Sequence, residues 1–104
     1  MEHMTYVYEK LKGAGFVRSQ YQFSREWLDR DRSYYSSIRA RATKPSVAAL
    51  TILEAKIGSE YELIHQSKTV SPSDQDRLDL LADLKIKSRS VIEARLTEKT
   101  RNLA

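Results

Sequence analysis

The chain has 104 residues, of which 40% are hydrophobic and 31% are charged, and this composition suits one compact domain with a modest core. It contains no cysteine, which excludes disulfides, thiolate metal sites and a cysteine nucleophile. Its mean hydropathy is −0.58 and no apolar run approaches the roughly 18 residues of a membrane span, so we expect no membrane association. The first residues lack the apolar stretch of a signal peptide, which favours a cytoplasmic location.

The positive charge is concentrated in one short segment. The formal net charge is +4, and basic and acidic residues balance everywhere except in residues 32–44. That segment contains no acidic residue and four cationic ones, namely Arg32, Arg39, Arg41 and Lys44. A run of charge is usually a solvated face, but an acid-free block inside a balanced chain is a candidate for contact with phosphate.

The sequence predicts an all-α protein, because it has no sustained apolar/polar alternation and no Asn-Gly or Asp-Gly hairpin turn. Five short helices are expected before residue 68. The predicted helices cover residues 5–12 with a cap at Thr5, residues 19–28, residues 32–40 after a cap at Asp31, residues 46–57 ended by Gly58, and residues 59–66 with a Ser59/Glu62 capping box.

The segment after residue 71 predicts one long helix or two shorter ones. Ser71 can cap its start, and Pro72 suits the first turn. An apolar stripe along it is expected either to form a homodimer or to pack back onto the chain's own first and fifth helices. The stripe consists of Leu78, Leu81, Leu84, Val91, Ile92 and Leu96.

The predicted helix over residues 32–40 has two different faces. Tyr35 and Ile38 are three residues apart and are expected to point into the core. The serines at 33, 36 and 37 would then point outward together with Arg39. Tyr34 is adjacent to Tyr35, so both cannot face the core, and Tyr34 is open to either a packing role or a DNA-facing one.

Residues 27–58 resemble the second half of phage-repressor/Cro-like (XRE-type) helix-turn-helix domains. The matching elements are Leu28, a turn over 29–31, a helix over 32–40 with inward Ile38, a basic stretch over 39–44, Pro45-Ser46, and a leucine-containing fourth helix. The sequence departs from the pattern at two places: Asp29 stands at the turn position that is often glycine, and the glycine usual after the recognition helix is absent, with Ala42 nearby instead. The resemblance implies a five-helix domain over residues 5–68. The helical extension over residues 71–104 lies outside the resemblance and is predicted from its own helix signals.

The resemblance implies a sequence-specific DNA-binding transcriptional regulator of prokaryotic or phage type, with double-stranded DNA and a second copy of the chain as partners. In such domains the second helix of the motif enters the major groove. Short serines would allow close approach, and cations would read guanine edges or bind phosphates. The expected DNA-binding residues are Arg32, Ser33, Tyr34, Ser36, Ser37, Arg39, Arg41, Thr43, Lys44 and Ser46.

Enzyme classes are poorly supported. There is no Gly-rich phosphate loop, no Gly-x-Ser-x-Gly elbow and no His-Glu-x-x-His motif, and the two histidines, His3 and His65, are far apart. We therefore expect no catalytic residues, no cofactor and no metal. The alternative function is a protein-interaction module, an anti-activator or adaptor on the same scaffold that does not bind DNA, favoured by the missing turn glycine and the modest total charge.

Overall fold

The computed structural model describes residues 2–67 and 69–103, with side chains described as far as Arg101. The prediction of an all-α protein is confirmed, since the described residues contain helices and no strand. The elements are α1 (His3–Gly13), α2 (Gln20–Gln22), the π-helical turn η1 (Phe23–Trp27), α3 (Tyr34–Ala40), α4 (Val47–His65) and α5 (Pro72–Leu103). None of the helices in this part of the chain combines the length and apolar character that crossing a bilayer requires.

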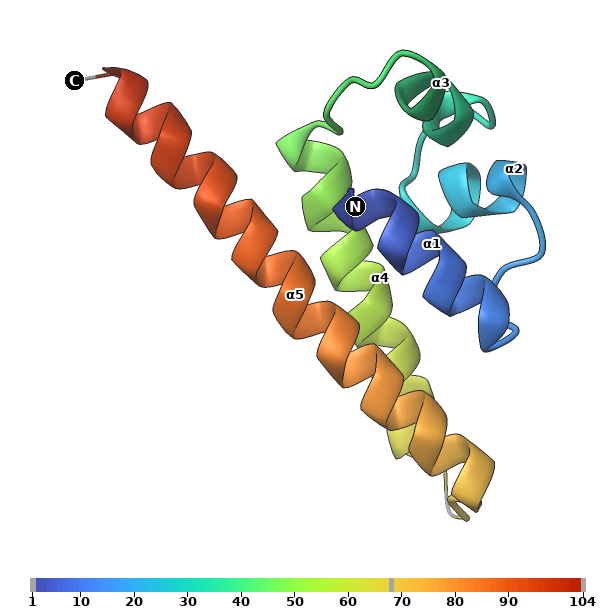
Figure 1. Ribbon diagram of the computed structural model, residues 1–104. Coiled ribbons are helices and arrows are strands. Elements are labelled where there is room, and N and C mark those ends of the chain that lie inside the picture. The colour runs from blue at the N-terminus through green and yellow to red at the C-terminus, as the bar shows by residue number, and fades with distance from the viewer. Residues whose placement is uncertain (1, 68, 104) are drawn as a thin grey trace.

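Two long helices form the axis of the molecule. Figure 1 shows α4 and α5 running side by side in opposite directions, with α1, α2 and α3 gathered beside the N-terminal half of α4. The C-terminal end of α5 extends past the other helices (Figure 1). One core of buried apolar residues connects all these parts, and it includes residues of η1, α3 and α5.

Three aromatic rings lie at the centre of this core. Tyr8, Phe23 and Tyr35 come from α1, η1 and α3, and their ring centroids are 5.0 to 5.3 Å apart. Such tilted and edge-to-face pairs add a favourable quadrupole interaction to the burial of apolar surface. The prediction that Tyr35 and Ile38 point inward is confirmed, and Phe23 and Trp27 are buried in the same core.

The predicted break at Gly58 is wrong. Instead, α4 continues to His65, and the capping box expected at Ser59 and Glu62 does not form. The helix continues because Ile57 is buried and Tyr61 packs against the same core, so the apolar stripe of α4 crosses the glycine without interruption. Packing of this stripe against α5 outweighs the cost of a single helical glycine, about 1 kcal/mol.

The long helix α5 begins where the sequence predicts and has no internal break. Ser71 and Asp74 cap it reciprocally: the Asp74 N–H donates to Ser71 Oγ at 3.1 Å, and the Ser71 N–H donates to Asp74 Oδ2 at 3.2 Å. Where the apolar stripe is interrupted, the small residue Ser88 is buried and forms a 3.0 Å hydrogen bond with Nε2 of His3.

The stripe on α5 is largely used within the chain. Four of its six residues, Leu78, Leu81, Leu84 and Ile92, are buried. Val91 is half-buried, and Leu96 remains 45% exposed near the end that extends past the body.

Candidate nucleic-acid interface

The helix α3 starts two residues later than predicted, at Tyr34 instead of Arg32. The reason is the carboxylate of Asp31, which accepts hydrogen bonds from the N–H of Ser33 at 3.1 Å and from its hydroxyl at 2.5 Å. These bonds lower the pKa of Asp31. Such a local Asp turn offers the backbone an alternative to the helix, so Arg32 and Ser33 lie in a turn that leads into α3.

A buried serine in η1 fixes the start of α3. Ser24 has no solvent exposure, and its Oγ accepts the N–H of Tyr35 at 3.0 Å. The Tyr35 hydroxyl donates to Oγ1 of Thr5 in α1 at 3.3 Å. Since Tyr35 and Ile38 are both buried, the opposite face of α3 must point away from the core. Sequence reasoning missed Ser24, because a serine within a predicted helix has no pattern that distinguishes a buried cap from a surface residue.

The turns on either side of α3 each contain a non-glycine residue in the left-handed backbone conformation. The φ angle is 51° at Asp29 and 52° at Ala42. After α3, the N–H of Thr43 donates to the Ile38 carbonyl at 3.0 Å and that of Ala42 to the Arg39 carbonyl at 3.3 Å, which is the Schellman pattern of a helix end. The backbone therefore forms the turn even though alanine has a steric penalty there.

The structure brings the ten predicted DNA-binding residues together on α3 and the loops next to it, at one end of the molecule (Figure 1). Three of them, Tyr34, Ser36 and Ser37, are half-buried. The exposed ones are Arg32, Ser33, Arg39, Arg41, Thr43, Lys44 and Ser46.

The cations of this segment have no carboxylate partner at ion-pair distance. Throughout residues 2–67 and 69–103, Arg32, Arg39, Arg41 and Lys44 form no ion pair within 4.0 Å. Their charges face solvent in a stretch that has no acidic residue, which raises the local positive potential.

Several side chains that are predicted to contact DNA form hydrogen bonds within the protein. The Tyr34 hydroxyl accepts the N–H of Ser46 at 3.0 Å, while Ser46 Oγ accepts the N–H of Ala49 at 3.1 Å and so caps α4. The Ser36 hydroxyl donates to the Ser33 carbonyl at 3.1 Å. Tyr34 and Ser46 therefore join α3 to the start of α4.

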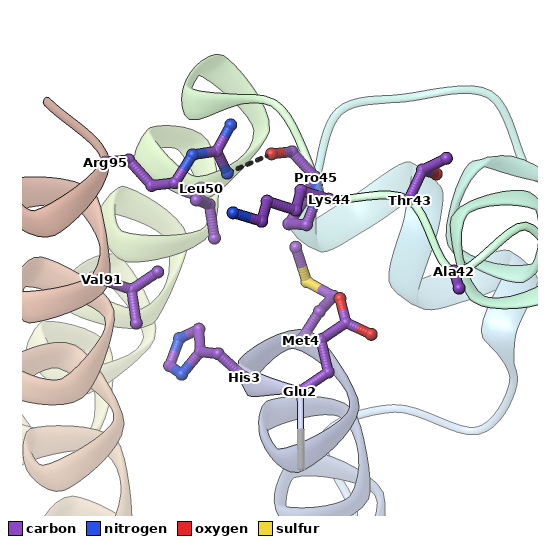
Figure 2. Close-up of a pocket in the computed structure, with 10 residues that line it drawn as sticks. All are labelled: Glu2, His3, Met4, Ala42, Thr43, Lys44, Pro45, Leu50, Val91 and Arg95. Atoms are coloured by element: carbon purple, nitrogen blue, oxygen red, sulfur yellow. Dashed lines mark hydrogen bonds between the residues drawn. The ribbon is translucent and has the colours of Figure 1, made fainter. Parts of the chain in front are cut away.

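The side chain of Lys44 does not follow α3. Figure 2 shows it directed from the loop between α3 and α4 toward a pocket bounded by α1 and α5. At the same rim Arg95 of α5 donates through Nη1 to the carbonyl oxygen of Pro45 at 2.7 Å (Figure 2).

The structure adds residues that sequence reasoning did not select. Tyr21 of α2 is 59% exposed, and the guanidinium carbon of Arg32 lies 5.9 Å from its ring centroid. Arg25 and Arg30 line a polar hollow together with Arg32, beside the carboxylates of residues 29 and 31. In the sequence these arginines alternate with acidic residues, and only the fold shows that they gather next to the start of α3.

These features define an all-α protein with an exposed, cationic short helix supported by a buried aromatic centre. The model of one protein family, described as a family of unknown function (DUF6626), matches residues 4–101. The chain therefore belongs to the DUF6626 family. No curated protein and no solved structure matches it.

Proposed function

We propose that this protein is a sequence-specific DNA-binding transcriptional regulator of the helix-turn-helix type, non-enzymatic, cofactor-free and cytoplasmic, with α3 as its recognition helix. The observation that carries the proposal is the two-sided character of α3. Its inner face is held by buried Tyr35 and Ile38, while the exposed segment around it carries four cations without a carboxylate partner in the described residues. A surface that enters a groove lined with phosphates needs this combination of exposure and positive charge.

The start of α3 is the part that suits base contacts. In helix-turn-helix proteins the N-terminal residues of the recognition helix reach base edges. Here Arg32 and Ser33 precede the helix, and Ser36 and Ser37 lie in its first turn and a half, where short side chains allow the backbone to approach the bases. Arg39 and Arg41, at the far end of α3, suit phosphate contacts.

Tyr34 and Ser46 contribute to the same surface indirectly in this proposal. Their 3.0 Å hydrogen bond holds the loop between α3 and α4, which carries Thr43 and Lys44. A loop that is tied at both ends presents its cations at a fixed distance from α3, which reduces the entropy lost when phosphates are bound.

We further propose that the protein acts as a homodimer that contacts DNA at two half-sites. A single α3 of seven residues buries little DNA, whereas paired recognition helices suit a near-palindromic site. Because most of the apolar stripe of α5 is buried within the chain, the dimer contact is assigned to Leu96 and the adjoining end of α5. Light scattering tests this part: a mass of one 12.0 kDa chain at micromolar concentration contradicts the dimer.

The experiment for DNA binding starts with selection of bound sequences from a random double-stranded library. The preferred site is then titrated at several salt concentrations with the wild type, Arg39→Ala and Arg41→Ala. Because each of these arginines is assigned to a phosphate, either substitution should reduce the slope of log K against log salt by about one. A base-reading Arg32→Ala variant should weaken binding by about 1–3 kcal/mol and relax specificity at one position.

Lys85→Ala is the matched control, because Lys85 is an exposed cation on α5 and its replacement changes the net charge by the same amount. Equal effects of Lys85→Ala and Arg39→Ala would indicate nonspecific charge attraction. A folded protein that selects no sequence and binds DNA at no salt concentration would favour the alternative function, a protein-interaction module on this scaffold.

A further inference from the structure

We propose that the pocket between α1, the loop joining α3 to α4, and α5 binds a small apolar molecule that carries one carboxylate. The cavity has a volume of about 380 Å³, within the range of sites that hold small organic ligands. It is formed by three segments that are far apart in the sequence (Figure 2). This inference concerns a different site from α3 and stands without the proposed function.

The walls of the pocket require a ligand with an apolar body. Met4 from α1, Leu50 from α4 and Val91 from α5 face one another across it, and Pro45 completes this lining from the loop. Met4 and Leu50 are fully buried among the lining residues, and burial of an apolar ligand group against these walls is favourable.

Two cations at one rim select an anionic group. Figure 2 shows Lys44 and Arg95 on the same side of the pocket, next to Leu50 and Pro45. The 2.7 Å bond from Nη1 to Pro45 holds the Arg95 side chain in place and uses one of its five N–H donors. The planar guanidinium matches the two oxygens of a carboxylate, and the flexible Lys44 can add a second charge-assisted bond.

The remaining titratable groups at the pocket leave this positive balance in place. Glu2 is the one carboxylate among the lining residues, against two cations. Burial and the nearby charge of Lys87 both lower the pKa of His3, which favours its neutral form. A cationic ligand would therefore meet like charges at the rim, and a doubly charged phosphate would have to enter a cavity with mostly apolar walls, so a monocarboxylate fits best.

The first test measures binding of 4-phenylbutyrate, its amide and phenylbutylamine, with phenyl phosphate as a second anion, by calorimetry and by NMR of the methyl groups. We expect saturable binding of the carboxylate with shifts at Met4, Leu50 and Val91, and binding of the amide weaker by about tenfold or more. Equal binding of acid and amide, stronger binding of the phosphate, shifts elsewhere, or no saturable carboxylate binding would overturn the proposal.

Variants connect the binding to the named groups. Arg95→Gln and Lys44→Gln should each weaken carboxylate binding by about tenfold, whereas Lys85→Gln, which removes an equal charge elsewhere on α5, should leave it unchanged. Val91→Phe should block the cavity, and circular dichroism shows whether this variant folds. If it does not fold, the site is located by NMR of Arg95→Gln instead. A smaller carboxylate-induced shift of the Leu50 methyl groups in this variant than in the wild type places the ligand in the pocket.

The pocket also shares Lys44 with the segment proposed to contact DNA. If that proposed function holds, 4-phenylbutyrate at saturation should weaken DNA binding in the wild type and have no effect in Lys44→Gln. This step alone rests on the proposed function. Carboxylate binding mapped to the pocket of a protein that binds no DNA would support the pocket and contradict only the regulator assignment.

Discussion

The amide N–H of Tyr35 donates a 3.0 Å hydrogen bond to the Oγ of Ser24, a serine that is completely buried. This bond joins η1 to the first turn of α3, where the helix itself offers no partner for the amide. A small polar side chain in the core therefore helps to set the orientation of the exposed face of α3.

Ser24→Ala should destabilise the protein by about 1–2 kcal/mol, because the buried amide of Tyr35 loses its partner. Urea unfolding followed by circular dichroism measures this change. The control is Ser59→Ala, because Ser59 is an exposed residue of α4. Its free energy of unfolding should stay within about 0.5 kcal/mol of the wild-type value. Equal stability of Ser24→Ala and the wild type would contradict the capping role.

Gly58→Ala should stabilise the protein by about 0.5–1 kcal/mol, because Gly58 lies in the middle of the continuous helix α4. A Cβ there would lie 3.0 Å from the Lys85 ammonium nitrogen, which is the free end of a flexible side chain and can move aside. Thermal unfolding gives the comparison. Gly15→Ala is the opposite case, since its φ of 84° disfavours a side chain, and it should lower the melting temperature.

Ala42→Gly should stabilise the protein by about 0.5–1 kcal/mol, since glycine removes the steric cost of the left-handed conformation at φ 52°. The same exchange at Ala55, an exposed residue in the interior of α4, should destabilise by a similar amount. Chemical denaturation gives the free energy of unfolding of both variants. Opposite changes show that the effect at position 42 comes from the left-handed backbone and not from glycine in general. A loss of stability in Ala42→Gly would show that the turn has another backbone geometry.

The protein should lose stability as the pH falls through the titration of His3. The folded state lowers the pKa of His3 below its ordinary value of 6.5, so the folded chain binds fewer protons than the unfolded chain between these two values. Stability consequently rises with pH across that interval and is lowest at its acidic end. Urea unfolding from pH 7.5 to 5 in the wild type and in His3→Gln measures the effect, and the variant should lack this part of the pH dependence.

The class of fold and the inner face of α3 could be predicted from the sequence because apolar spacing decides both. Tyr35 and Ile38 are three residues apart, and a helix places such residues on one side. The extent of α4 could not be predicted. The local preference of Gly58 is to end a helix, and α4 continues through it because α5 packs alongside. Local signals contain no information about that later segment.

The candidate site could be predicted in part. The exposed cations were found because their charge is concentrated between residues 32 and 44, and exposure follows from charge. The bond between Tyr34 and Ser46 and the contact between Arg95 and Pro45 were not predictable, because each joins residues whose proximity depends on the complete fold. For the same reason no sequence pattern indicated the pocket beside Lys44.

The hydrogen bond between His3 and Ser88 connects residues 85 positions apart, and α1 contributes part of the core that α5 completes. During synthesis on a ribosome, the first helix emerges long before its final neighbour exists. The apolar surface that α1 shares with α5 therefore stays uncovered until α5 has been synthesised.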